Sequence, residues 1–507
     1  MLMTQPKRDP IERVVIVGGG TAGWIAAAVL GKMLGKAVAI ELIESDAIGT
    51  VGVGEATIPQ IRRLNGALGI DEADFVARTR GTFKLGIEFN NWGRLGESYL
   101  HTFGDLGMTL NATAFHHYWL RYRDSHQGSS AWDYSLHHRA AYAHKFAPVD
   151  KVGRTSMTGL AYAYHFDAGL YAHYLRGVAE RHGVVRTEGR VTSVAQDSES
   201  GFITSVSLES GDEVRGDLFV DCTGFRGLLI GQTLGVDYLD WSHLLPCNRA
   251  AAVPSERDGP LMPYTKATAH GAGWQWRIPL QHRTGNGHVF CDSFISEDEA
   301  ISTLLEHLDA PATAEPKLLK FTTGRRRELW SKNCVSLGLA SGFLEPLEST
   351  SIHIIQSNVG RLVELFPDKA CDPTVVSEYN RIVGGEYDTI RDFLILHYAQ
   401  TQRDDTEFWR YCANMDVPES LRDKVELFRT SGRIYHDADD LFREASWVQV
   451  MLGQNVDPES WHRQADVLTD AQLEQFMGDL QRLIAKTVDS LPSHAEFIGR
   501  TCAMEAA

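Results

Sequence analysis

The chain has 507 residues, which is long enough for one large domain or for two to three ordinary ones. Hydrophobic residues make up 43% of the sequence, a share that is typical of globular proteins and argues against disorder. The formal net charge is −17 at pH 7. Because an acidic surface repels phosphate groups, we expect neither nucleic acid nor an anionic membrane as a partner.

Targeting and metal-binding patterns are not evident in the sequence. No run approaches the ~18 consecutive apolar residues of a membrane span, and the N-terminal MLMTQPKRDP contains no apolar signal-peptide segment. The seven cysteines are scattered and form no CxxC pair, which argues against a disulfide framework and against zinc. We therefore expect a cytoplasmic protein without a metal, and the sequence leaves open whether it is a monomer or a homodimer.

The N-terminal segment has the pattern of a βαβ unit. An apolar run at residues 13–17 is typical of a buried parallel strand. It is followed by GGGTAG at residues 18–23, by an Ala-rich stretch at 24–34 that predicts a helix, and by a second expected strand at 37–43. Glu44 ends that strand, about 20 residues after the glycines. This arrangement predicts a dinucleotide-binding site.

Each position of the glycine-rich turn has a separate expected task. Gly18 would permit the tight turn, Gly20 would let a pyrophosphate approach the backbone, and Gly23 would let the helix pack against the strand. At the start of the helix, the amides of Thr21 and Ala22 would face the phosphates.

Glu44 and two later segments complete the expected cofactor site. Glu44 is placed to bind ribose hydroxyls, with a solvated loop carboxylate as the alternative. Residues 221–224 (DCTG) follow an apolar strand and resemble the second nucleotide-binding stretch of flavoprotein monooxygenases. Gly338 and Leu339 belong to GLASG at 338–342, which resembles the third stretch. Each segment alone could be an ordinary strand-to-helix turn, whereas all three in this order indicate FAD rather than NAD.

Later parts of the chain mix strand and helix patterns before they become helical. From about residue 374 onward, apolar residues recur at three- and four-residue spacing, and Thr469 and Gln472 stand in capping-box positions. The expected elements are strands at 202–208, 213–220 and 334–337, a strand-rich part at 240–320, and helices at 352–365, 375–396, 419–429 and 471–491.

These elements predict an α/β fold. We expect a Rossmann-like FAD-binding module of the monooxygenase (GR2) type at residues 1–365, with an inserted β-rich part that covers the substrate. A helical C-terminal subdomain at residues 366–507 would pack on it, so that the whole chain forms a single compact unit.

Four motifs narrow the class of protein. They are GVGEATIP at residues 52–59, GTFKLG at 81–86, WQWRIP at 274–279 and EPLEST at 345–350. Together they resemble motifs of the flavin-dependent tryptophan halogenases, and WQWRIP matches the WxWxIP signature of that family. The resemblance covers the chain to about residue 365 and becomes patchy beyond it. It is closer to the bacterial indole brominases of the family than to its strict tryptophan halogenases.

The resemblance implies a reaction and two catalytic residues. A separate flavin reductase would supply FADH2, which with oxygen and chloride or bromide gives hypohalous acid. The acid would pass through an internal tunnel to an electron-rich aromatic substrate. Lys84 would hold the oxidised halogen, by a hydrogen bond or as a haloamine, and Glu348 would orient or polarise it or take the ring proton.

Of these two roles for Lys84 we favour the hydrogen bond. A haloamine needs a neutral lysine, and a nearby carboxylate such as Glu348 opposes neutrality unless burial is strong. Outside these motifs, the same two residue types would predict an ordinary salt bridge.

The resemblance also places Thr350 and Ser351 at a halide site, with their amides facing the anion. Tryptophan halogenases usually have glycine at the position of Ser351. A serine adds a Cβ and a hydroxyl and makes a positive φ costly, which would alter the size of the site. Because bromide is also easier to oxidise than chloride, we predict a preference for bromide.

Aromatic residues form the expected surroundings of the substrate. Trp274 and Trp276 would keep the substrate away from the flavin and so prevent monooxygenation, with core packing as the alternative. His101 and Phe103 match positions that sandwich the indole ring of the substrate. The alternatives are a loop histidine at 101 and a core phenylalanine at 103.

The C-terminal side of the pocket departs from the family pattern. Residues 446–455 (SWVQVMLGQN) include Trp447, an expected substrate contact. They lack the adjacent tyrosines and the following glutamate that clamp an amino acid's amine and carboxylate. The charges of a zwitterion would be poorly paired there, which is costly in a desolvated site. We therefore expect indole, a substituted indole or an aromatic group on a larger scaffold rather than free tryptophan.

Two other functions share parts of this pattern. An FAD-dependent aromatic monooxygenase would have the three nucleotide-binding segments, but not the motif at 274–279 or the context of Lys84. A non-catalytic flavin-binding protein would not need both Lys84 and Glu348. A halogenase is therefore the first prediction, and a monooxygenase is the alternative.

Overall fold

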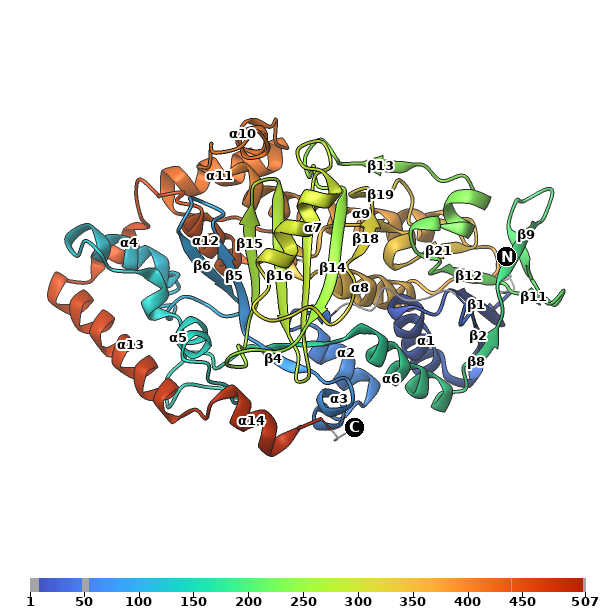
Figure 1. The fold of residues 1–507 in the computed structure, drawn as a ribbon, viewed down its shortest axis with the longest axis horizontal. Coiled ribbons are helices and arrows are strands. Elements are labelled where there is room, and N and C mark those ends of the chain that lie inside the picture. Colours follow the sequence, from blue (N-terminus) through green and yellow to red (C-terminus); the bar gives the residue numbers. More distant parts are fainter. Residues whose placement is uncertain (1–8, 48–53, 439, 505–507) are drawn as a thin grey trace, which may run out of the picture.

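A six-stranded sheet carries the part of the molecule that is expected to bind the nucleotide, at the right of Figure 1. The computed structural model describes residues 9–47, 54–438 and 440–504. The strand order is β20 (Trp330–Ser331), β21 (Cys334–Ser336), β12 (Leu218–Asp221), β1 (Arg13–Val17), β2 (Ala39–Glu44) and β8 (Val185–Glu188). β1 pairs in parallel with β2 and β12, and it is buried on both faces. This burial explains its continuous apolar run.

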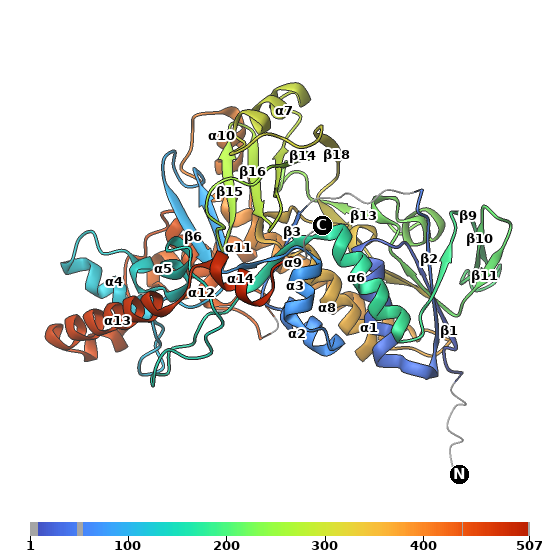
Figure 2. The ribbon, with the colours of Figure 1, turned by 60° about the horizontal axis from the view of Figure 1, so that its bottom comes forward.

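Helices cover one face of this sheet (Figure 2). They are α1 (Thr21–Leu34), α6 (Ala168–Arg181) and α8 (Ser351–Glu364), and α1 packs against the other two. The predicted helix at 24–34 is confirmed, but α1 begins earlier because the chain becomes helical directly after Gly20. β2 begins at Ala39, two residues later than expected, because a short 3-10 turn precedes it.

The other face carries a small antiparallel sheet. It consists of β9 (Val191–Gln196), β10 (Ile203–Leu208) and β11 (Glu213–Arg215). The single strand expected at 213–220 is wrong, because β11 joins this small sheet and β12 joins the central one. An added Cβ at Gly216 would lie 2.7 Å from a side chain of β1. The Asp217 carboxylate accepts hydrogen bonds from the amides of Glu12 and Arg13, which fixes the chain between the two sheets.

A seven-stranded sheet forms the middle of the molecule (Figure 1). Its order is β18 (Lys317–Lys320), β14 (Arg249–Ser255), β17 (Thr284–Phe290), β16 (Gly273–Pro279), β15 (Thr265–His270), β5 (Gly86–Asn90) and β6 (Ser98–Thr102). Neighbouring strands are antiparallel except β15 and β5. The strand-rich part expected at 240–320 is confirmed, and it is inserted between β12 and β21 of the nucleotide-binding sheet.

A three-stranded sheet connects the two larger sheets. It consists of β3 (Gly54–Ala56), β7 (Ala163–Asp167) and β4 (Thr82–Lys84), and β3 also packs against β16 and β17. Gly52 and Val53 of the GVGEATIP motif lie outside the described residues. The other elements before α8 are β13 (Tyr238–Asp240), β19 (Gly324–Arg326), β22 (Gly342–Phe343), α2 (Ile61–Leu68), α3 (Glu72–Arg78), α4 (Phe115–Ser125), α5 (Leu136–Tyr142) and α7 (Glu297–Glu306).

The C-terminal part is helical, as the apolar spacing predicts. Its helices are α9 (Pro373–Ala399), α10 (Glu407–Asn414), α11 (Glu419–Ser431), α12 (Glu444–Gly453), α13 (Asp470–Ser490) and α14 (His494–Thr501). The capping box of Thr469 and Gln472 at the start of α13 is confirmed. Among the described residues, no helix is both long and apolar enough to cross a membrane.

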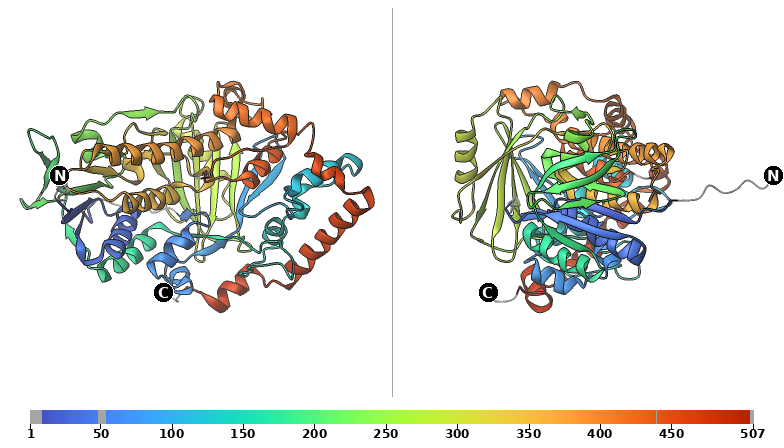
Figure 3. Two further views of the ribbon diagram at one scale, coloured as in Figure 1. Left: turned by 180° about the vertical axis from the view of Figure 1, so that it is seen from behind. Right: turned by 90° about the vertical axis from the view of Figure 1, so that its right-hand side faces the viewer.

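The long helix α9 connects the side of the six-stranded sheet to the C-terminal helices, and Figure 3 shows the molecule from behind and from the side. At 27 residues it is about 40 Å long. It packs against α8 and β20 on the nucleotide side, and against α10, α11 and α12 on the other. The domain boundary at residue 365 stays a prediction.

Candidate active site

A cavity of about 510 Å³ lies at the carboxyl ends of β1, β2 and β12. This is the edge where open α/β sheets bind their ligands. Its walls include the expected cofactor residues Gly18, Gly20, Thr21, Ala22, Glu44, Gly338 and Leu339. The structure thus brings the three nucleotide-binding segments together, and their contact with FAD stays a prediction.

The glycine-rich turn has the shape that a bound phosphate requires. Gly18 has a φ of +113°, and an added Cβ there would lie 2.2 Å from the carbonyl oxygen of Cys222, so only glycine fits. Gly23 does not line the cavity, and an added Cβ there would lie 1.8 Å from the carbonyl oxygen of Gly18. Gly20 faces open space, and no side chain caps the first turn of α1. These uncapped amides fit the pyrophosphate of FAD.

Glu44 is held beside this turn by two donors. Trp24 Nε1 donates to its Oε2 at 3.2 Å, and Arg186 Nε donates to its Oε1 at 2.5 Å. The Glu44 side chain is 17% exposed. The alternative of a solvated loop carboxylate is therefore wrong, and its contact with ribose stays a prediction.

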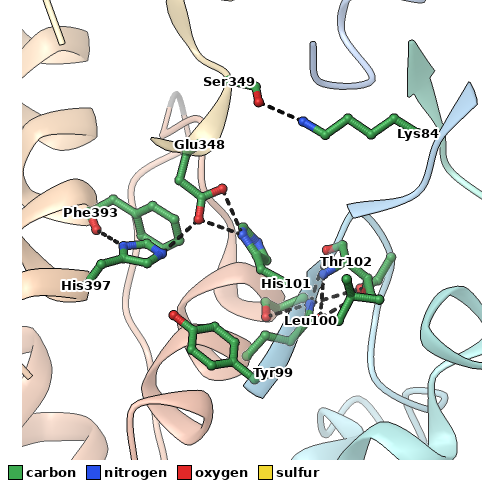
Figure 4. Close-up of polar contacts among 12 residues, drawn as sticks. Lys84, Tyr99, Leu100, His101, Thr102, Glu348, Ser349, Phe393 and His397 are labelled. Atoms are coloured by element: carbon green, nitrogen blue, oxygen red, sulfur yellow. Dashed lines mark hydrogen bonds and ion pairs between the residues drawn. The ribbon is translucent and has the colours of Figure 1, made fainter. Parts of the chain in front are cut away.

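Lys84 is completely buried at the end of β4 (Figure 4). Its Nζ donates hydrogen bonds to the carbonyl oxygen of Thr57 at 3.0 Å and to Oγ of Ser349 at 2.7 Å. Nζ also lies 5.2 Å from the centre of the Phe103 ring. Burial lowers the pKa of Lys84 to about 7, and the charge of Glu348 opposes this shift. The ammonium and the neutral amine are therefore both populated near neutral pH.

Glu348 ends the 3-10 turn Pro346–Glu348 and is 1% exposed. Nδ1 of His101 lies 3.0 and 2.9 Å from its two carboxylate oxygens, and Nε2 of His397 lies 2.9 Å from its Oε1 (Figure 4). Burial alone would raise the pKa of Glu348, but His101 and His397 together lower it to about 2. Across the described residues no ion pair joins Glu348 to Lys84. The ordinary salt bridge, which the residue types alone suggest, is therefore wrong.

The residues that follow Glu348 begin α8. Ser349 has a φ of 60° and a ψ of 36°, a left-handed conformation, and its Oγ accepts the hydrogen bond from Lys84. Thr350 is fully buried as the N-cap residue, and Ser351 is the first residue of the helix and lines the cavity. The cost that a positive φ would have at Ser351 does not arise, because the positive φ occurs at Ser349 and Ser351 has helical backbone.

The first glutamate of EPLEST, Glu345, holds a tryptophan of the WQWRIP motif. Its Oε2 accepts hydrogen bonds from Trp274 Nε1 at 2.9 Å and from the Tyr398 hydroxyl at 2.6 Å. Burial raises the pKa of Glu345 to about 7, although both hydrogen bonds oppose the shift. The two glutamates of the EPLEST motif therefore have pKa values shifted in opposite directions. The pKa of Glu345 is raised, whereas that of Glu348 is lowered, so that Glu348 is held as an anion.

Both tryptophans of the WQWRIP motif lie on β16 and line the cavity. Gly287 on the neighbouring strand lies opposite Trp276, and an added Cβ there would lie 2.0 Å from the Trp276 ring. Trp274 and Trp276 also belong to the main hydrophobic core. The two tryptophans can thus pack in the core and line the expected flavin cavity at the same time. That they keep the substrate away from the flavin stays a prediction.

The expected substrate residues share one aromatic region. His101 lies on β6, so the alternative of a loop histidine is wrong. Its ring centre lies 5.6 Å from that of Phe393, which stacks on Phe442 at 3.8 Å and meets Trp447 edge-on at 4.9 Å. Phe103 is half-buried and faces Lys84, so it is not simply a core residue. Because Nδ1 of His101 contacts Glu348, this ring does more than offer a stacking surface.

Three partners of Lys84 and Glu348 are absent from the sequence predictions. Two of them, the Thr57 carbonyl and Ser349, stand within the GVGEATIP and EPLEST motifs, so their motif context was a usable signal. The third, His397, lies in the long helix α9, outside all motifs. The sequence indicates only that His397 lies on the buried face of that helix.

One group of metal-type side chains occurs elsewhere among the described residues. His116, His117 and Glu444 each offer an atom within 4.8 Å of the others. His116 Nε2 donates to the carbonyl oxygen of Gly432 at 2.7 Å, and His117 Nδ1 accepts from the amide of His462 at 3.2 Å. The neutral His117 ring therefore carries its proton on Nε2 and has no spare lone pair for a metal.

The glycine-rich turn at an open cavity, the two tryptophans in its wall and the buried lysine bonded to Ser349 are the features expected of a flavin-dependent oxidoreductase. The chain belongs to the Tryptophan halogenase family, which it matches over residues 13–470. It is similar to tryptophan 6-halogenase ThaL from Streptomyces albogriseolus, with 36% identity over 527 residues, covering 95% of this chain and 97% of that protein. Family and relatives together show that the chain is a flavin-dependent halogenase.

Two solved structures of halogenases have the same fold. Xcc4156, a flavin-dependent halogenase from Xanthomonas campestris, is 49% identical with a TM-score of 0.95, over 98% of this chain and 100% of that chain. BrvH, a flavin-dependent halogenase from Brevundimonas sp. BAL3, is 42% identical with a TM-score of 0.93, over 96% of this chain and 99% of that chain. The expected mixed α/β fold with a helical C-terminal part is confirmed.

Proposed function

We propose that the enzyme takes FADH2 from a separate flavin reductase and halogenates indole or a related electron-rich aromatic. The observation that carries this proposal is the bond between Lys84 Nζ and Ser349 Oγ, at 2.7 Å. Ser349 lines the nucleotide cavity, whereas Lys84 is completely buried behind it. One hydrogen bond therefore connects the expected flavin site to the expected halogen carrier.

The cavity residues would hold FAD through backbone and carboxylate contacts. The amides of Thr21 and Ala22 would bind the pyrophosphate, Glu44 would bind the ribose, and the backbone at Gly338 and Leu339 would lie along the flavin. Reduced FAD supplies, with oxygen, the oxidising equivalents that turn halide into hypohalous acid.

Lys84 fits the role of holding that acid by a hydrogen bond. An ammonium group has three donors, and the Thr57 carbonyl and Ser349 Oγ accept from it. One donor then remains for the oxygen of the acid. Because the pKa of Lys84 is about 7, the ammonium form dominates below neutral pH. A haloamine would need the neutral amine, whose share grows above that pH.

Glu348 fits the role of orienting the acid or of accepting the ring proton. As a buried carboxylate it attracts the ammonium of Lys84 without contacting it. When the halogenated ring loses its proton, the electron pair of that C–H bond returns to the ring and restores aromaticity. The proton passes to a carboxylate oxygen of Glu348.

The variants Lys84→Ala and Glu348→Gln test these roles. Each should lose about 100-fold or more of aromatic halogenation, because a positioned donor or base is removed. Both should still bind FAD and oxidise FADH2, since neither residue lines the cavity. The measurement combines oxygen uptake with product mass, using FAD, a flavin reductase, NADH, halide and a panel of indoles.

Full halogenation by Lys84→Ala would reject the proposed mechanism. A wild-type product that gains oxygen in place of halogen would identify the alternative, an aromatic monooxygenase.

The polar side chains of α12 support a substrate without amino acid charges. Gln449 accepts hydrogen bonds from both the amide and the hydroxyl of Thr102, at 3.0 and 2.9 Å. Gln454 donates to the Tyr99 hydroxyl at 3.3 Å. These side chains are engaged within the protein, in the stretch where tryptophan halogenases clamp the zwitterion. The aromatic region around His101 remains as a surface for a flat, apolar ring.

Indole should therefore be halogenated at least about tenfold more efficiently than L-tryptophan, measured as kcat/KM. The reason is the cost of burying two charges without partners. Tryptamine and indole-3-propionate, which each keep one of the two charges, separate the contribution of the amine from that of the carboxylate. Efficient turnover of L-tryptophan with inert indole would overturn the proposed substrate.

The proposed preference for bromide now rests on two points, the size of the halide site and the easier oxidation of bromide than of chloride. Ser351 lines the cavity with a Cβ and a hydroxyl where relatives usually have glycine, but it adds no backbone strain. At matched concentrations, bromide should give more product than chloride. Ser351→Gly should move this ratio toward chloride, because the added side chain is removed.

The control for this variant is Ser357→Gly, on the same helix but outside the cavity wall. Glycine in the middle of the helix, with loss of the Ser357 hydrogen bond to Glu386, disturbs α8 at least as much as the change at Ser351, yet this variant should keep the wild-type ratio. Equal or faster product formation by the wild type with chloride would contradict the preference.

A further inference from the structure

His397 is completely buried near the end of α9, and the proposed function gives it no task. Its ring centre lies 4.7 Å from that of Phe89 and 5.4 Å from that of Phe393. Its Nδ1 lies 2.9 Å from the carbonyl oxygen of Phe393, and its Nε2 lies 2.9 Å from Oε1 of Glu348 (Figure 4). The imidazole therefore connects the helix backbone to the carboxylate.

The contact with the backbone assigns one proton of this ring. A carbonyl oxygen only accepts hydrogen bonds, so Nδ1 of His397 carries hydrogen. In a neutral ring, Nε2 would then have an unprotonated lone pair. That lone pair would face a carboxylate oxygen at 2.9 Å, and two acceptors at this distance repel each other. The close approach of Nε2 to this oxygen is therefore favourable when Nε2 also carries hydrogen.

His101, on the other side of Glu348, does not require a second ring proton. Its Nδ1 contacts both carboxylate oxygens, so one N–H satisfies the contact while the ring stays neutral. Nε2 of His397 lies at ion-pair distance from Glu348 but makes no hydrogen bond of good geometry, so this contact acts mainly through charge. The two imidazoles therefore serve Glu348 in different ways.

We propose that His397 is a positioning residue that stays protonated on both ring nitrogens and holds Glu348 as an oriented carboxylate beside Lys84. The inference rests on the proposed role of Glu348. It also explains how Lys84 stays free, because His397 supplies the counter-charge that a buried carboxylate needs. Lys84 can then donate to Thr57, Ser349 and the hypohalous acid instead of forming a salt bridge.

Four titratable groups act on Glu348, from three elements. His101 and Tyr99 lie on β6, His397 lies on α9 and Lys84 lies on β4. Burial raises the pKa of Tyr99 well above its usual value, so it stays neutral. Without His397, the charge opposite Glu348 would come mainly from Lys84, and the Lys84 pKa of about 7 leaves that side chain only partly charged near neutral pH. Since burial raises the pKa of Glu348, that pKa should then rise toward the neutral range.

Two substitutions separate charge from hydrogen bonding at this position. His397→Gln keeps an N–H donor for Glu348 but has no positive charge, and His397→Phe removes both. The matched control is His288→Gln in the central sheet, where a buried histidine likewise places Nδ1 3.0 Å from a carbonyl oxygen, that of Ala300. His288 lies outside the cavity wall and away from Glu348.

The experiment compares halogenation and FADH2 oxidation across pH in the flavin-loaded enzymes. Both His397 variants should lose roughly tenfold or more of the kcat for halogenation in the acidic range. The acid limb, the part of the pH profile where kcat falls as pH decreases, should move upward by at least about one pH unit. KM for the aromatic, FADH2 oxidation and the alkaline limb should stay close to those of the wild type. His288→Gln should keep the wild-type profile throughout.

A measurement on the wild type does not depend on how the variants fold. In ¹⁵N spectra of histidine-labelled enzyme recorded under the assay conditions, one buried imidazole should carry hydrogen on both ring nitrogens. That signal should be missing from the His397→Gln spectrum.

The inference is overturned if no such signal exists, if His397→Gln keeps the wild-type acid limb, or if kcat falls equally at every pH. The proposed function fails separately, if Lys84→Ala halogenates fully in the same assay.

Discussion

The site depends on how one buried carboxylate is neutralised. Glu348 is 1% exposed, and removing the partner of such a charge costs about 3–5 kcal/mol in proteins. In this enzyme two imidazoles contact the carboxylate, and the nearby lysine does not. Lys84 has its own partners, Thr57 and Ser349. A buried lysine and a buried glutamate can thus act together on one small molecule without quenching each other in a salt bridge.

One short segment arranges these partners. Glu345 holds Trp274 in the cavity wall, Glu348 meets the imidazoles, and Ser349 accepts from Lys84. Ser351 then begins α8 at the cavity. The sharp change of direction between these side chains comes from a 3-10 turn followed by a left-handed serine. The same segment therefore contributes to the expected flavin site and to the expected halogen site.

The sequence predicts best those features whose local chemistry leaves few choices. Gly18 cannot be replaced without a clash with Cys222, so the turn expected to bind the nucleotide is recognisable from its glycines. The helix caps of α13 depend on neighbours only three residues apart, and they too are predicted correctly. The split between β11 and β12 is missed, because it follows from packing beneath Gly216 that no local pattern expresses.

The partners within the site are less predictable, because they come from distant parts of the chain. Lys84 and Ser349 are 265 positions apart, and only the family motifs indicate that they belong together. His397 carries no motif, and helical periodicity predicts its burial but not what it contacts. The cost that a positive φ would have at Ser351 does not arise, because the backbone places the left-handed residue at Ser349.

Burial outweighs the nearby carboxylate at Lys84 and lowers the pKa of its amine to about 7. An NMR titration of the Lys84 side chain measures this pKa, with its signal assigned as the one missing from Lys84→Ala. We expect a midpoint near pH 7 in the wild-type enzyme. A midpoint at about 10.4, as for an exposed lysine, would show that burial does not control this amine.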